Sequence, residues 1–204
     1  MIDRSRFNDF KPTQQTGERQ SLPAGVYEGH IIAAKVDTNN GGQTLIIQVE
    51  IDKGEYAGFF RKQYDAAQGG QFPAKYKGVY RLQLPDGKNP DHDNIRQHQL
   101  EGAVWALEDG NPAYHWDWDE SKLKGLKVGL NVREREYYFN GTSGVTTEIG
   151  RFESVTQINN PDESKRPKPM KKRELSAKDK AQKAQDQMNA SGYVEVESEE
   201  LPWA

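Results

Sequence analysis

The sequence predicts a mainly β fold, a small five-stranded barrel with one helix between its third and fourth strands. Apolar and polar residues alternate over 45–52 and 126–132, the period of two that is typical of half-buried strands. Between 94 and 107 the apolar spacing changes to that of a helix. A parallel sheet would need a helix after nearly every strand, and the pattern contains only one.

The first two strands are expected on either side of a tight turn. Leu22-Pro23-Ala24-Gly25 is typical of a turn that leads into a β-rich stretch over 26–37. Asn39-Asn40-Gly41-Gly42 supplies residues that tolerate the positive φ of a hairpin turn. The alternating run that follows predicts the second strand.

The third strand is expected over 59–65 (FFRKQYD), and residues 66–93 are expected to form an elaborated loop. That loop is interrupted by glycines and prolines and contains one short strand-like piece, 78–84. The helix should begin with Asp93 or Asn94 as its N-cap and end at Gly110.

The last two strands are expected over 126–132 and 146–158, joined by a hairpin loop at 140–144 (NGTSG). Three strands, a connection that carries one helix, and two further strands follow the order of the OB fold, a small and partly open barrel. The sequence therefore predicts an OB-fold-like five-stranded barrel.

Charge is distributed unevenly along the chain. The formal net charge is −3, but residues 165–183 alone carry nine basic and two acidic side chains. The residues before this segment sum to −5, and so do those after it. We expect an N-terminal arm at 1–21, an OB-like domain at 22–160, a basic flexible linker at 161–192 and a disordered acidic protein-interaction tail at 193–204.

Several classes of protein are disfavoured by what the sequence lacks. It has no cysteine, phosphate-binding loop, nucleophile elbow or His-Glu-x-x-His motif, so we expect no enzyme and no cofactor. No apolar run suits a membrane span or a secretory signal, which predicts a protein of the cytoplasm. Asp117, Asp119 and Glu120 leave a metal-dependent nuclease open as a less favoured alternative. In the competing interpretation Trp116 and Trp118 close one end of the barrel.

Basic and aromatic residues are interleaved in a way that suits single-stranded nucleic acid. Bases stack on exposed rings while arginine and lysine neutralise the phosphates. We expect Tyr64, Tyr76 and Tyr137 to be exposed, and Phe60 and Phe152 to pack in the core. The predicted nucleic-acid-binding residues are Arg61, Lys62, Tyr64, Lys75, Tyr76, Lys77, Arg81, Arg133, Arg135 and Tyr137.

The chain closes with YVEVESEELPWA, an acidic run that ends in an aromatic residue. A flexible segment of this kind can place a tryptophan in a pocket of a partner while its carboxylates meet basic residues around that pocket. The same acids could instead compete with DNA for a basic groove. The predicted partner-binding residues are Glu197, Glu199, Glu200, Leu201, Pro202 and Trp203.

Two resemblances bear on function. The runs NPAYHWDWDESKLKGLKVG (111–129) and REREYYFNGTSG (133–144) resemble a family of phage proteins from the replication and recombination region, commonly described as single-stranded-DNA-binding. LPAGVYEGHI and GEYAGFFRKQYD are similar as well, so the likeness covers residues 22–160. The tail resembles the acidic C-terminus of bacterial single-stranded-DNA-binding proteins, although here Ala204 follows the tryptophan.

These resemblances imply a phage protein of the host-cell cytoplasm that coats single-stranded DNA and recruits phage or host replication and recombination proteins through its tail. An accessory protein-interaction module that never touches DNA remains an alternative. Formation of a homo-oligomer is left open by the sequence.

Overall fold

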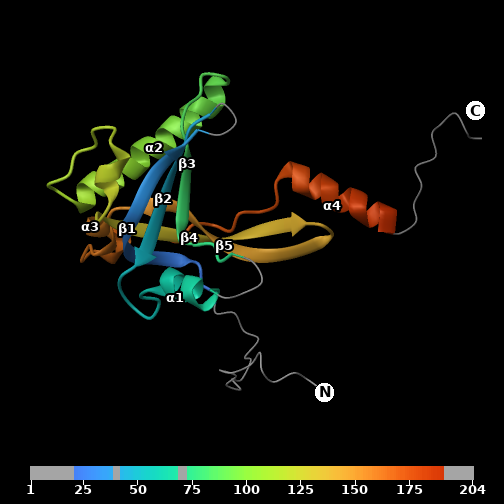
Figure 1. Cartoon of the computed structure of the whole chain (residues 1–204), viewed down its shortest axis with the longest axis horizontal. Coiled ribbons are helices and arrows are strands. Elements are labelled where there is room, and N and C mark those ends of the chain that lie inside the picture. The colour runs from blue at the N-terminus through green and yellow to red at the C-terminus, as the bar shows by residue number, and fades with distance from the viewer. Residues whose placement is uncertain (1–20, 39–41, 69–72, 191–204) are drawn as a thin grey trace, which may run out of the picture.

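The computed structural model describes residues 21–38, 42–68 and 73–190, which form one β-sheet with flanking helices (Figure 1). The strands are β1 (Gly25–Asp37), β2 (Thr44–Ile51), β3 (Val79–Gln83), β4 (Lys127–Phe139) and β5 (Thr142–Glu153). The helices are α1 (Phe59–Ala66), α2 (Pro90–Gly110), α3 (Val155–Ile158) and α4 (Ala177–Ala190), with 3-10 turns η3 (Glu120–Leu123) and η4 (Glu163–Lys165). Within these ranges, no helix has both the length and the apolar character needed to cross a membrane.

The five strands form an antiparallel sheet in the order β3-β2-β1-β4-β5. β1 is shared between two neighbours, because its first half pairs with β4 and its second half pairs with β2. Among the described residues no ladder joins the outer strands β3 and β5, so the sheet is not closed into the predicted barrel. The rings of Tyr80 and Phe152 instead bring these two strands together, with centroids 4.5 Å apart.

The prediction of a third strand over 59–65 is wrong, because these residues form the helix α1. Gly58 begins the helix with φ 71°, a left-handed conformation that glycine adopts without strain. The buried carboxylate of Glu50 on β2 then accepts hydrogen bonds from the backbone N–H groups of Phe60 (3.0 Å) and Arg61 (2.6 Å). A side chain from a neighbouring strand therefore satisfies the first turn of α1.

The third strand of the sheet is β3, which falls inside the stretch that was expected to form a loop. β5 also ends earlier than expected, since Ser154 caps the short helix α3 with its hydroxyl at 3.1 Å from the N–H of Thr156. The number of strands is therefore as predicted, but the third strand lies elsewhere, β4 continues to Phe139, and β5 begins at Thr142 and ends at Glu153.

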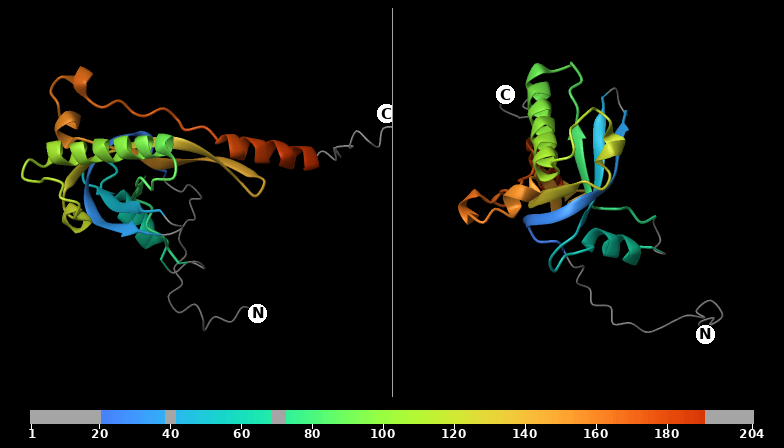
Figure 2. Two further views of the ribbon diagram at one scale, coloured as in Figure 1. Left: turned by 90° about the horizontal axis from the view of Figure 1, so that it is seen from above. Right: turned by 90° about the vertical axis from the view of Figure 1, so that its left-hand side faces the viewer.

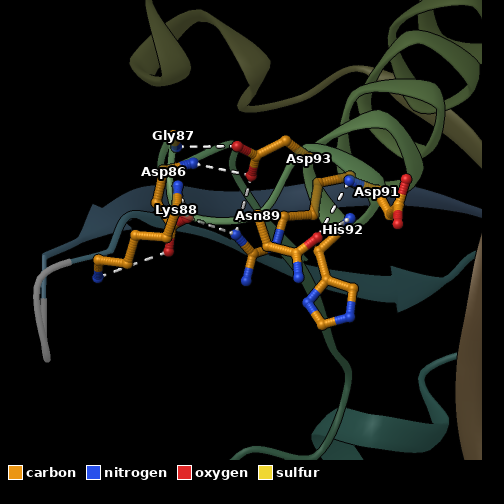
Figure 3. A network of polar contacts seen from close by, with 8 residues as sticks. Asp86, Gly87, Lys88, Asn89, Asp91, His92 and Asp93 are labelled. Atoms are coloured by element: carbon orange, nitrogen blue, oxygen red, sulfur yellow. Dashed lines mark hydrogen bonds and ion pairs between the residues drawn. The ribbon is translucent and has the colours of Figure 1, made fainter.

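The helix α2 begins at Pro90, a few residues before the predicted start, because Asn89 acts as its N-cap. The Asn89 side chain accepts hydrogen bonds from the N–H groups of Asp91 (3.0 Å) and His92 (3.2 Å). Asp93 folds back to accept from Asp86 and Gly87 in the preceding turn (Figure 3). These bonds fix the turn that joins β3 to α2, and the helix ends at Gly110 as predicted.

The core lies between one face of the sheet and the helix α2. The predicted apolar positions 45, 47, 49 and 51 on β2 and 128, 130 and 132 on β4 are buried, although Glu50, Gly129 and Asn131 between them are buried too. Phe60 and Phe152 are buried as expected. The fully buried aliphatic residues are Ile31, Ile47, Val49, Ile51, Leu82, Leu107, Leu123, Val128, Leu130 and Val132. Each contributes on the order of 2 kcal/mol by leaving water.

Candidate nucleic-acid interface

The β4–β5 hairpin projects from the body of the molecule (Figure 1). β1 pairs with β4 only as far as Val132, so residues 133–139 continue without β1 and pair with β5 alone. In Figure 2 this two-stranded ribbon extends beyond α2, with α4 running beside it. The hairpin therefore offers surface that the sheet does not bury.

One face of this ribbon combines cations and rings. Arg133, Arg135, Tyr137 and Phe139 occupy alternate positions on β4 and so point to the same side. Tyr137 is 37% exposed, which confirms the prediction that it lies at the surface, and Phe139 is 71% exposed. We call these four residues the hairpin face. Phe139 is missing from the predicted set, although the alternation R-x-R-x-Y-x-F indicates it.

Glu148 on β5 organises the arginines of the hairpin face. Its carboxylate accepts from Nη2 of Arg133 at 2.8 Å and lies 3.5 Å from Nε of Arg135. Arg173, from the segment before α4, approaches it at 3.3 Å. Three guanidinium groups share one carboxylate, so the cluster keeps a net positive charge. Arg135 remains accessible, since its side chain is less buried than that of Arg133.

Residues 168–175, which we call the strap, run along the free edge of β4. The N–H of Arg173 donates to the carbonyl of Glu134 (2.8 Å), and the N–H of Glu136 donates to the carbonyl of Arg173 (2.9 Å). The expected flexible linker over 161–192 therefore contains, in its described part, a segment that is hydrogen-bonded to the sheet and the helix α4. Tyr138 donates to Asp186 of that helix at 2.6 Å.

A fully buried asparagine anchors the strap. Asn131 donates from Nδ2 to the carbonyl of Lys168 (3.0 Å) and to Glu153 (2.7 Å), and its Oδ1 accepts from the N–H of Met170 (3.1 Å). Every polar atom of this side chain is satisfied, as a buried amide requires. Lys168 and Lys171 of the strap are exposed and have no ion pair among the described residues.

A third lysine of the strap, Lys172, forms an ion pair. Lys172 lies 2.8 Å from Glu136, and this hydrogen bond raises the pKa of Lys172 and lowers the pKa of Glu136. The strap therefore combines three ion pairs, Lys172–Glu136, Arg173–Glu148 and Glu174–Lys180, with two lysines that have no ion pair among the described residues.

The remaining predicted residues lie on α1 (Arg61, Lys62 and Tyr64), in the segment before β3 (Lys75, Tyr76 and Lys77) and on β3 (Arg81). Tyr76 donates its hydroxyl to Glu50 (2.9 Å) and to the carbonyl of Val49 (2.9 Å), and Tyr64 packs edge-on against it with ring centroids 5.9 Å apart. Burial and the Glu50 carboxylate raise the pKa of Tyr76. The expectation that Tyr64 and Tyr76 are exposed is therefore wrong, because both rings are half-buried.

The basic residues of this second group stay at the surface. Arg61 pairs with Asp65 (3.4 Å), and Lys62 donates to the carbonyl of Ala57 (2.9 Å). Lys75, Lys77 and Arg81 are exposed and have no ion pair in the described ranges. No hydrogen bond, ion pair or ring contact between described residues joins this group to the hairpin face. The ten predicted residues thus belong to two groups, three on β4 and seven on α1, on β3 and on the segment between them.

The candidate metal ligands are engaged in local contacts. Asp117 is bound to Lys122, and Asp119 accepts from the N–H and hydroxyl of Ser121 at 3.1 and 2.6 Å. These contacts lower the pKa of both aspartates. Within the described residues, no three His, Asp or Glu side chains stand close enough to hold one ion. The neighbouring Trp118 is 76% exposed with φ 68°, so it does not close the end of the sheet.

The predicted partner-binding residues, from Glu197 to Trp203, lie outside the described residues, as does the N-terminal arm apart from its last residue. A comparison with models of known protein families found no match, and a comparison with curated proteins found no significant match. The resemblance to the phage family therefore stays a prediction.

Proposed function

We propose that this protein binds single-stranded nucleic acid, and single-stranded DNA in particular, with little sequence preference. The observation that carries the proposal is the hairpin face, in which two arginines and two accessible rings follow one another at alternate positions of one strand. Phe139, which is 71% exposed and lines a surface pocket with Arg135 and Arg173, buries little apolar area and so contributes little to folding. It suits a partner that offers both flat apolar rings and negative charge.

The spacing of the hairpin face fits such a partner. Alternate residues of a strand stand about 6.6 Å apart, close to the span of one nucleotide in a stretched single strand. Bases stacked on Tyr137 and Phe139 would each contribute about 1 to 3 kcal/mol. The phosphates beside these bases would meet Arg135, and the strap lysines Lys168 and Lys171 could meet phosphates farther along the strand, toward Asn131.

The strand order supports this function by analogy. An antiparallel sheet in the order β3-β2-β1-β4-β5, with α2 between β3 and β4, has the order of an OB fold whose seam between β3 and β5 is open. Proteins with this fold often bind single strands beside the loop between the fourth and fifth strands. Because fold alone does not determine function, the hairpin face carries more of the argument.

The charge distribution supports electrostatic binding as well. The chain has a net charge of −3, so a polyanion can bind only where cations are concentrated. The strap brings part of the +7 segment over 165–183 onto the arginine-rich hairpin. Binding should weaken as salt is added. For each phosphate contact, a tenfold rise in the salt concentration should lower the logarithm of the affinity by about 0.7.

A binding titration with single-stranded DNA, double-stranded DNA and single-stranded RNA oligonucleotides of equal length tests the proposal. Single strands should bind more tightly than duplex, and added salt should weaken that binding. Equal affinity for duplex, or no affinity for any of them, would contradict it. No affinity for any nucleic acid would favour the alternative, an accessory protein-interaction module.

The biological setting and the role of the tail are further parts of the proposal. We place the protein in phage DNA replication or recombination, with the tail from Glu195 to Ala204 as the segment that recruits partner enzymes. Deletion of that tail should leave binding to single strands intact or tighter and should abolish capture of replication proteins. Loss of DNA binding in the deletion variant would contradict this division of labour.

A further inference from the structure

The outer edge of β5 is unpaired among the described residues and lacks the usual protection of an edge strand. Residues 142–147 (TSGVTT) contain no charge and no proline, and Val145 is exposed. The equivalent edge of β4 is covered by the strap, and the other outer strand, β3, is short and carries Arg81. A long uncharged edge is a template for pairing with another strand.

A groove opens where this edge approaches α2. It measures about 570 Å³ and is lined on the helix by Ile95, Gly102 and Trp105 and on the strand by residues 150–153. Ile95 is 56% exposed and Trp105 is 50% exposed. Two large apolar side chains therefore lie open beside an unpaired strand edge.

We propose that two copies of this chain pair through β5, antiparallel, about a two-fold axis close to Thr146. A second copy is the occupant that the edge fits, because the strand is complementary to itself in this register. Thr146 faces Thr146 of the second copy and Glu148 faces Gly144, and the regular pairing ends near Ile149, because a bulge at Gly150 shifts the register of β5. No two like charges stand opposite each other, and β-branched residues occupy the centre of the pairing.

The same register brings the second copy to the groove. Its hairpin turn at Asn140 and Gly141 comes beside residues 150–153 of the first copy, where Ile95 and Trp105 are open. By symmetry the two copies cover each other's grooves. Directly opposite residues in a pair of strands share one face, so both hairpin faces lie on the same side of the joined sheet.

The dimer does not depend on nucleic-acid binding, and its test uses the full chain without nucleic acid. Light scattering should give twice the chain mass. The chain has no cysteine, so single-cysteine variants report proximity without background. Directly paired residues stand about 4.5 to 5.5 Å apart between Cα atoms, within the range of a disulfide. Thr146→Cys should therefore form linked dimers on mild oxidation.

The matched control is Gln83→Cys, an exposed position on the other outer strand, which should link far more slowly. Val145→Lys should convert the dimer to a monomer with an unchanged circular dichroism spectrum, whereas Gln83→Lys should not. A monomeric wild-type chain at the highest attainable concentration would overturn the proposal. So would a dimer in which Thr146→Cys links no faster than Gln83→Cys.

Discussion

The ring of Tyr137 lies directly on Gly144 of the neighbouring strand. A Cβ atom added at Gly144 would stand only 2.6 Å from the ring, far inside van der Waals contact. Tyr137 and Gly144 are paired across β4 and β5, so the glycine provides the flat floor on which the ring rests. The tyrosine is thereby held on the hairpin face while 37% of it stays exposed.

Gly144→Ala should displace this ring and weaken nucleic-acid binding. The backbone at residue 144 is an ordinary strand, so alanine is tolerated and the tyrosine has to move. Part of a stacking contact would be lost, which lowers the affinity for oligo-dT about three- to tenfold. Fluorescence titration measures this, with Ser143→Ala on the opposite face as control. Equal affinities of the two variants would contradict a stacking role for Tyr137.

Phe139→Ala should weaken binding more than the loss of an equally exposed ring elsewhere. Removal of one base-stacking ring costs about 1 to 3 kcal/mol, or roughly 5- to 150-fold in affinity. Trp118→Ala is the matched control, because Trp118 is similarly exposed but lies on the loop before η3. A larger loss of affinity in Trp118→Ala than in Phe139→Ala would contradict this prediction and would indicate that single strands bind at the loop before η3.

The regular parts of the fold were predictable because their signals are local. Alternation on β2 and β4 and the helical spacing of α2 follow from which residues must leave water. The segment FFRKQYD is ambiguous in sequence, since a pair of phenylalanines fits a strand as well as a helix. It becomes α1 because Glu50, ten residues before Phe60, caps it. A contact of that kind is visible only in three dimensions.

The candidate site was predictable in part for the same reason. Arg133, Arg135 and Tyr137 share a strand, so their alternation places them together. Tyr76 cannot be told from an exposed ring by sequence, because its burial depends on the distant Glu50 carboxylate. The position of the strap could not be predicted from the sequence either, because it depends on the hydrogen bond between Asn131 and the backbone of Met170, which is 39 residues away.

Glu50→Gln should destabilise the fold without touching the hairpin face. The carboxylate accepts from two N–H groups of α1, from the N–H of Ile51 and from the hydroxyl of Tyr76, and an amide nitrogen cannot replace an accepting oxygen. The free energy of unfolding should fall by about 1.5 to 3 kcal/mol. Urea unfolding measures it, and Tyr76→Phe should show a smaller loss. An unchanged unfolding midpoint would refute the capping role.

Stability should fall above pH 10 in part through Tyr80. Burial raises the pKa of Tyr80 from 10.0 to about 12, so its neutral form stabilises the fold below pH 10 and this contribution is lost between pH 10 and 12. The loss is on the order of 3 kcal/mol. Tyr80→Phe keeps the ring contact with Phe152 and should show a shallower decline in urea unfolding over this range. If the free energy of unfolding fell equally steeply with pH in Tyr80→Phe and in the unchanged protein, the proposed contribution of Tyr80 would be refuted.

Photocrosslinking to a single strand that contains iodinated uracil tests the central claim most directly. Trypsin releases residues 136–151 as one peptide with Tyr137 and Phe139, whereas Tyr64 falls in residues 63–75. Mass spectrometry should find the crosslinked base on the peptide 136–151. Crosslinks confined to residues 63–75, or spread over peptides from both surfaces without preference, would show that the hairpin face is not where single strands bind.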